Sequence, residues 1–306
     1  MLKIKRILLI APTEMTRTPA FNRAQELACA TRALLHIVAF DYVQTLAVAG
    51  LFDYNAMAQA REGYLQVHRQ WLEQQARFQR SAGAQVTTEV VWARSSLAHV
   101  LAYVNNFRAD LVIKDTLHVR AIDRVFHPPL DWQLLRDCSA AVHLVTNGNN
   151  PKPLKILAAI DLSHLEALSH GLNEHILELA TTLTHACSAD LHMVNVSNWS
   201  VVEHSTKSVP TQSLDDSLRD AVTDAQDEGF EVLGERYDIE KTHRHQLTGI
   251  PHRVIADYAK GNAFDMVVLG TGYQHGIERF IGSTAENLLN RSSCSLTIVK
   301  PASWLD

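Results

Sequence analysis

The chain has 306 residues, of which 46% are apolar and 20% are charged, the balance of a globular protein that buries a large core. This composition excludes a disordered, collagen-like or coiled-coil chain, and the length predicts two domains. Residues 1–150 carry 16 Lys and Arg against 12 Asp and Glu, whereas residues 151–306 carry 12 against 21. Neither half gathers a basic stripe, so we expect no direct contact with nucleic acid.

The apolar runs are short, and the earliest, at residues 7–10, is too short for a leader or a membrane span. We therefore expect a cytoplasmic protein with no membrane span. The four cysteines show no CxxC spacing and the sixteen histidines no HExxH spacing. The sequence thus predicts buried thiols rather than disulfides, no protein-built metal site, and no recognisable set of catalytic residues.

The first half alternates apolar runs of strand length with segments of helical periodicity. A helix is predicted where Tyr64, Val67, Trp71 and Phe78 fall on one face, and Gly83 is its expected end. The strands expected in this half are residues 7–10, 33–38, 86–92, 111–113 and 142–145.

The second half has the same alternation. Helical spacing is found over residues 170–184 and again from Leu214 to Ala225, where Ser213 is a candidate N-cap and Gly229 a candidate stop. The strands expected in this half are residues 156–160, 191–196, 231–237, 266–269 and 296–299.

The two halves resemble each other at offsets of 150 to 156 residues. Lys5–Ala11 aligns with Lys155–Asp161, and Asp110–Ile113 aligns with Asp265–Val268. The turn-forming residues at 147–153 mark the join. We therefore expect two α/β domains, residues 1–148 and 154–306, each with about five parallel strands.

The segment after the fourth expected strand of the second half is rich in glycine. Gly270 and Gly272 leave room for close approach of a ligand, and Gly282-Ser283-Thr284 opens a helix whose free N–H groups and hydroxyls suit a phosphate. The spacing fits neither the dinucleotide fingerprint nor a P-loop. A glycine-rich turn kept for tight packing is the alternative interpretation.

This segment resembles the phosphate loop of the universal stress protein family, G-x2-G-x9-G-[ST], in which Gly272, nine residues and Gly282-Ser283 supply the second part. One residue separates Gly270 from Gly272 where the family has two. Asp131-Trp132-x-Leu134-Leu135-Arg136-x-Cys138 and Gly282-x-Thr284-Ala285-Glu286 are similar to the tandem E-type members. The resemblance implies two tandem five-stranded open sandwiches of the adenine nucleotide alpha hydrolase-like type, related by a pseudo-twofold axis.

The resemblance also implies ATP, with Mg²⁺, as the ligand of the second half. Asp161 would lie near the ribose and the metal-bound phosphates, and Val196 would present its backbone to adenine. The residues that would line the phosphates are Gly270, Gly272, Gly282, Ser283 and Thr284.

The first half departs from this pattern. Its first strand ends in Ala11 rather than an acid, and no glycine occurs between Leu111 and Gln133. We expect no nucleotide there. Its apolar stretch Leu46–Phe52 is expected to pack on the other half or a second chain, or else to cover a pocket for a hydrophobic, lipid-like ligand.

The family role implied is a stress-response binding or signalling module. Three alternatives stay open: an adaptor without nucleotide, a binder of a hydrophobic ligand, and a weak ATPase or autophosphorylating protein. The partners expected are an intrachain pseudo-dimer paired through the strands at 142–145 and 296–299, a homodimer, and a protein partner that the sequence does not name.

Overall fold

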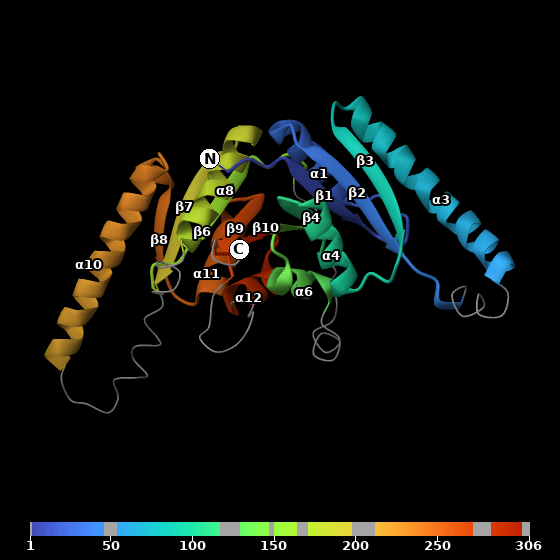
Figure 1. Ribbon diagram of the computed structural model, residues 1–306. Helices are drawn as coiled ribbons and strands as arrows, with labels where there is room; N and C mark the ends of the chain where they lie inside the picture. Colours follow the sequence, from blue (N-terminus) through green and yellow to red (C-terminus); the bar gives the residue numbers. More distant parts are fainter. Residues whose placement is uncertain are drawn as a thin grey trace. The chain divides into compact units, whose positions relative to one another are not determined.

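The computed structural model describes residues 2–45, 54–116, 129–146, 150–163, 171–197, 212–271 and 283–301. The chain divides into two compact units, one of residues 3–152 and the other of residues 153–306 with the first two residues. Within the described residues, each unit has five parallel β-strands joined by helical crossovers (Figure 1). The predicted α/β class is therefore confirmed.

The first unit has the strand order β3-β2-β1-β4-β5. Its elements in chain order are β1 Arg6–Ala11, α1 Pro19–Thr31, β2 Leu34–Asp41, α3 Tyr54–Ser81, β3 Gln85–Trp92, α4 Leu97–Phe107, β4 Leu111–Asp115, α6 Leu130–Asp137 and β5 Ala141–Val145.

The second unit has the equivalent order β8-β7-β6-β9-β10. Its elements are β6 Lys155–Ile160, α8 Leu172–Cys187, β7 Asp190–Ser197, α10 Gln212–Arg236, the 3₁₀ turn η1 Lys241–His243, β8 Arg244–Thr248, α11 Pro251–Gly261, β9 Met266–Gly270, α12 Ser283–Arg291 and β10 Ser295–Val299. The central strands are buried almost along their whole length, as expected for parallel strands covered on both faces.

Matching backbone contacts support the duplication. The carboxylate of Asp110 accepts hydrogen bonds from two backbone N–H groups at the start of β1. The carboxylate of Asp265 accepts hydrogen bonds from the two equivalent N–H groups at the start of β6. Both α1 and α8 end in a residue with left-handed backbone, Arg32 at φ 58° and Ser188 at φ 53°. The two units thus share details of folding as well as topology.

The predicted strand at residues 231–237 and the predicted helix stop at Gly229 are wrong. Helix α10 runs through both, because Phe230 and Leu233 are buried at helical spacing. The strand in this place is β8, residues 244–248, which is polar and partly exposed at the edge of the sheet. An edge strand of this kind lacks the apolar run by which buried strands are recognised.

The predicted inner face of α3 is also partly wrong. Val67 is 55% exposed and Phe78 58% exposed, whereas Leu65, Leu72 and Ala76 are buried. The helix carries apolar residues on two faces, and the guanidinium carbon of Arg17 lies 4.4 Å from the centre of the Phe78 ring, covering part of the outer face.

Three cysteines, Cys138, Cys187 and Cys294, are buried free thiols, whereas Cys29 is partly exposed. Strands β5 and β10 each stand at one end of the strand order of their own unit. Their pairing, and the pseudo-twofold axis, stay predictions. The segment Leu46–Phe52 lies outside the described residues.

Candidate functional site

In each unit, two neighbouring central strands are followed by crossovers that lead toward opposite edges of the sheet. In the second unit the chain passes from β6 to β7 on one side and from β9 to β10 on the other. Right-handed crossovers place the helices after β6 and after β9 on opposite faces. The carboxyl ends of these two strands form the topological switch point, where open α/β sheets bind ligands.

Three of the residues predicted for the site lie at this edge of the second unit. Asp161 directly follows β6, Val196 is the penultimate residue of β7, and Gly270 is the last residue of β9. Because β6 stands between β7 and β9, the three lie on neighbouring strands.

The chain at Asp161 is fixed by two buried asparagines. The side chain of Asn173 accepts a hydrogen bond from the N–H of Asp161 at 2.9 Å and donates one to its carbonyl at 2.7 Å. Asn195 accepts from the N–H of Leu162 at 3.3 Å. The carboxylate of Asp161 accepts from the N–H and the hydroxyl of Ser163, at 2.9 and 2.6 Å. These contacts hold an acidic side chain at the switch point in a defined orientation.

Gly270 is required by packing. A Cβ atom at this position would lie 2.6 Å from Cδ2 of Leu172, at the start of α8, closer than carbon atoms approach without a shift. The alternative interpretation of the glycine, tight packing, therefore has direct support, and it leaves open a second role toward a ligand.

Thr271, which follows Gly270, is fully buried. Its N–H donates to the carbonyl of Val299 at 3.1 Å, but its hydroxyl has no hydrogen-bond partner among the described residues. A buried hydroxyl without a partner costs free energy unless another group supplies one. Thr271 thus offers an unused donor and acceptor at the switch point.

Helix α12 begins at Ser283, where the sequence predicts a helix start. Thr284 is half-buried in its first turn. Gly272, Gly282 and the side chain of Ser283 lie outside the described residues, so their predicted roles toward the phosphates stay predictions.

The switch point of the first unit is filled by its own carboxylate. Asp115 ends β4, in the place that Gly270 has in β9, and accepts hydrogen bonds from the hydroxyl of Thr18 and from the N–H of Ala20 at 3.1 Å. These groups lie at the N-terminus of α1, where an external anion would otherwise bind. Burial raises the pKa of Asp115 despite these hydrogen bonds.

Sequence reasoning missed Asn173, Asn195 and Thr271. Asn195 is 4% exposed within an otherwise apolar strand, and Asn173 is 1% exposed in the first turn of α8. The available signal was an asparagine within an otherwise apolar segment, because a buried amide requires hydrogen-bond partners and so indicates a structural role.

Within the described ranges, no three or more His, Cys, Asp or Glu side chains are grouped closely enough to hold a metal ion. No helix there is long and apolar enough to cross a membrane.

The fold defines a tandem, doubly wound α/β protein whose two switch points differ in sequence and geometry. Residues 154–300 match the profile of the Universal stress protein family. This match covers nearly the whole second unit, and the whole chain is a two-unit protein similar to universal stress protein E.

The similarity extends over nearly the whole chain. Universal stress protein E of Escherichia coli K12 is 27% identical over 97% of this chain and 94% of its own. The universal stress protein E homolog of Haemophilus influenzae is 23% identical over 98% and 99%. A functionally unknown protein from Pseudomonas aeruginosa PAO1 has the same fold, with a TM-score of 0.73, 21% identity and coverage of 99% and 94%. A universal stress protein from Archaeoglobus fulgidus gives a TM-score of 0.61, with 16% identity over 97% and 96%.

Proposed function

We propose that the chain acts in the stress response as a binding and signalling module that holds one ATP, at the switch point of the second unit. The observation that carries the proposal is the buried hydroxyl of Thr271, which lies beside the carboxyl end of β6 and has no hydrogen-bond partner within the part of the chain that the structure describes. A ligand that reaches this hydroxyl would remove the cost of leaving it unbonded.

The residues around Thr271 fit a nucleotide with its phosphates. The N–H groups in the first turn of α12 would suit a phosphate, and Gly272, Gly282, Ser283 and Thr284 would line it. Val196, at the end of β7, would lie against the base. Asn173 and Asn195 would keep the backbone beside the ligand in place.

Asp161 would supply a carboxylate toward Mg²⁺. This ion commonly binds one or two carboxylates together with phosphate oxygens and water, so a cluster of three protein ligands is not needed. When bound, the ion would neutralise charge on the phosphates; the protein's part would be to hold the Asp161 carboxylate through Ser163.

The first unit would not bind ATP, because Asp115 already places a negative charge on the N-terminus of α1. A phosphate there would be repelled by this carboxylate and deprived of its donors. The proposed ratio is therefore one nucleotide per chain. The adaptor hypothesis would require the second switch point to be silent as well.

Paired threonine variants test the proposal. Thr271→Val keeps the shape of the side chain and removes the hydroxyl, whereas Thr116→Val makes the same change at the equivalent position after β4, where the hydroxyl donates to the carbonyl of Val145 at 3.2 Å. Isothermal titration with Mg·ATP should show binding weakened about tenfold by Thr271→Val, the effect of about 1.4 kcal/mol for one hydrogen bond, and unchanged by Thr116→Val.

Equal affinities for the two variants would show that Thr271 does not contact the ligand. Failure of the unmodified chain to bind would favour the adaptor. ATP hydrolysis that is lost in Gly282→Trp would favour the weak ATPase; turnover that survives this change is not intrinsic.

A further inference from the structure

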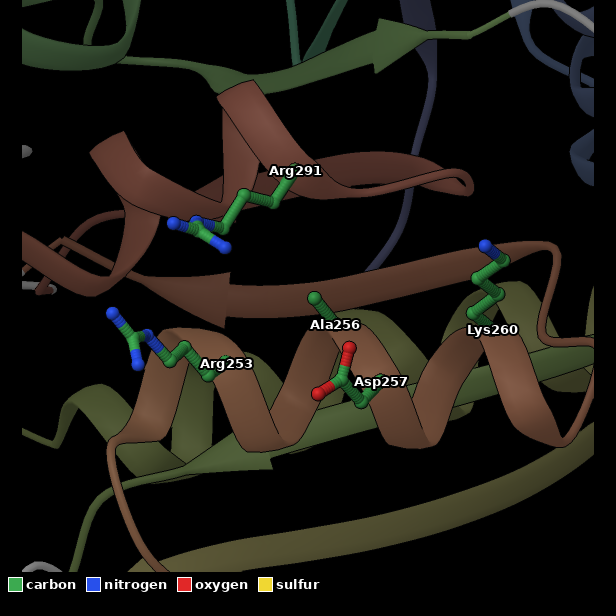
Figure 2. Close-up of a pocket in the computed structure, with 5 residues that line it drawn as sticks. All are labelled: Arg253, Ala256, Asp257, Lys260 and Arg291. Carbon is green, nitrogen blue, oxygen red and sulfur yellow. The ribbon is translucent and has the colours of Figure 1, made fainter.

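A second recess lies in the same unit, between α11 and α12, and none of its lining residues belongs to the proposed nucleotide site. It has a volume of about 290 Å³ and is lined by Arg253, Ala256, Asp257, Lys260 and Arg291 (Figure 2). We call it the basic groove. Its volume is at the lower end of the range for small-molecule sites.

The floor of the basic groove is apolar and its walls are charged. Ala256 is buried at 8% exposure, and its small side chain leaves the space between the helices. In Figure 2 the guanidinium groups of Arg253 and Arg291 lie at one end, the ammonium group of Lys260 at the other, and Asp257 between them. The groove therefore carries two separate positive ends and one hydrogen-bond acceptor.

The four charged side chains that line the groove do not pair with other side chains that the structure describes. Within the described residues, none of the four makes an ion pair or a side-chain hydrogen bond, although Asp257 is spaced to pair with Arg253 or Lys260 along α11. Solvated cations of this kind are common on a surface with balanced charge. Here residues 151–306 carry only 12 Lys and Arg against 21 Asp and Glu, and three of those cations line one recess.

The position of Arg253 does not favour helix stability. It is the third residue of α11, whose first turn has no acidic residue, and a cation at that end opposes the helix dipole. Burial, and then the positive charges of Arg291 and Arg253, lower the pKa of His252. Figure 2 shows the two guanidinium groups at the same end of the groove. An anion between them would relieve their mutual repulsion.

The spacing along α11 indicates the length of the ligand. Lys260 lies seven positions after Arg253, which corresponds to about 10 Å along a helix. A chain of about six carbons with an anionic group at each end has a comparable length.

We propose that the basic groove binds a small phosphorylated metabolite with an anionic group at each end and a hydroxyl between them, as in a sugar bisphosphate. Arg253 and Arg291 hold one phosphate, Lys260 holds the other, and Asp257 accepts a hydrogen bond from the hydroxyl. Arginine suits phosphate because its planar donors bind two oxygens together. This site is independent of the nucleotide site at the switch point.

Fructose 1,6-bisphosphate is the probe, titrated calorimetrically at low ionic strength with inorganic phosphate as the single-anion comparison. We expect one site per chain, and affinity lowered at least about tenfold by Lys260→Gln and by the pair Arg253→Gln and Arg291→Gln. The matched control is Arg236→Gln with Lys241→Gln, which removes two positive charges elsewhere in the same unit and should change affinity less than about twofold.

Asp257 provides a test of specificity. The preference for fructose 1,6-bisphosphate over 1,6-hexanediol bisphosphate, which lacks the hydroxyls, should fall toward one in Asp257→Ala. Thr271→Val should leave the binding of the bisphosphate unchanged, which separates this site from the nucleotide site.

Three results would overturn the proposal. If the control pair weakens binding as much as the groove variants, only the overall charge matters. If inorganic phosphate binds as tightly as the bisphosphate, the groove takes an adventitious ion only. If polyglutamate binds and the bisphosphate does not, the groove is a protein-docking surface.

Discussion

His192 should make the second unit sensitive to acid. Its Nδ1 lies 2.9 Å from Nε2 of His245, and its ring stacks on that of His243 with centres 3.9 Å apart. Burial, then the positive charges of His243, His245 and Lys155, lower the pKa of His192 to about 4, against the smaller opposing effect of Asp190. One nitrogen of the His192–His245 pair must donate and the other accept, so the contact is lost when both rings are protonated.

Because the pKa of His192 is lower in the folded chain, its contribution makes the folded unit less stable as the pH falls. The unfolded chain takes up the proton near pH 6.5 and the folded chain only near pH 4, so the stability is fully present above pH 6.5 and is lost between these values. A shift of about 2.5 units corresponds to about 3.4 kcal/mol at most. His192 is partly exposed, so solvent screening reduces this to about 1.5 kcal/mol.

The variant His192→Gln tests this reasoning, since it keeps a donor toward His245 and cannot be charged. Hydrogen exchange of the β7 and β8 amides, at pH 7 and pH 4.5, measures the stability of this unit. The unmodified chain should lose about 1 kcal/mol more than the variant on acidification. The matched control, His185→Gln on the exposed side of α8, should behave like the unmodified chain. An equal acid response in His192→Gln and the unmodified chain would refute the argument.

Three further substitutions should lower stability by distinct routes. Gly270→Ala should cost about 1–3 kcal/mol through contact with Leu172, and Leu172→Ala in the same chain should recover part of it; thermal unfolding measures both, and an unchanged Tm in Gly270→Ala would contradict the packing role. His68→Leu should cost about 1–3 kcal/mol, because it removes the His68 contact of the Asp41 carboxylate, 2.6 Å from His68 Nδ1 and 6% exposed, and leaves it only the Tyr64 hydroxyl among the described residues; an unchanged free energy in urea unfolding would show that the contact is not needed. Asp265→Ala should cost about 1–3 kcal/mol by freeing two N–H groups at the start of β6, with early loss of exchange protection there as the readout, and retained protection would argue against it.

The duplication and most strands could be predicted because central parallel strands are apolar along their whole length. Residues 156–160 and 266–269 show this pattern plainly, and both lie in strands. The prediction failed at β8, a polar edge strand, and at residues 231–237, whose apolar residues suit a helix as well as a strand.

The candidate site could be predicted only in part, because contacts between distant residues create it. Asp161 and Gly270 stand at the ends of strands that can be predicted from their apolar runs. The two hydrogen bonds between the Asn173 side chain and the backbone of Asp161, in contrast, depend on the packing of α8 against β6. In the first unit, Asp115 accepts a hydrogen bond from the N–H of Ala20 at the start of α1, and these two residues lie 95 positions apart in the chain. The basic groove likewise depends on Arg253 and Arg291 coming together from two helices.

We propose that the switch point of the second unit takes a nucleotide and that Asp115 closes the switch point of the first. Native mass spectrometry of the chain with Mg·ATP measures this directly, because it counts nucleotides on each chain. We expect one bound nucleotide per chain, lost in Gly282→Trp. No bound nucleotide, or two, or one that survives Gly282→Trp, would contradict it.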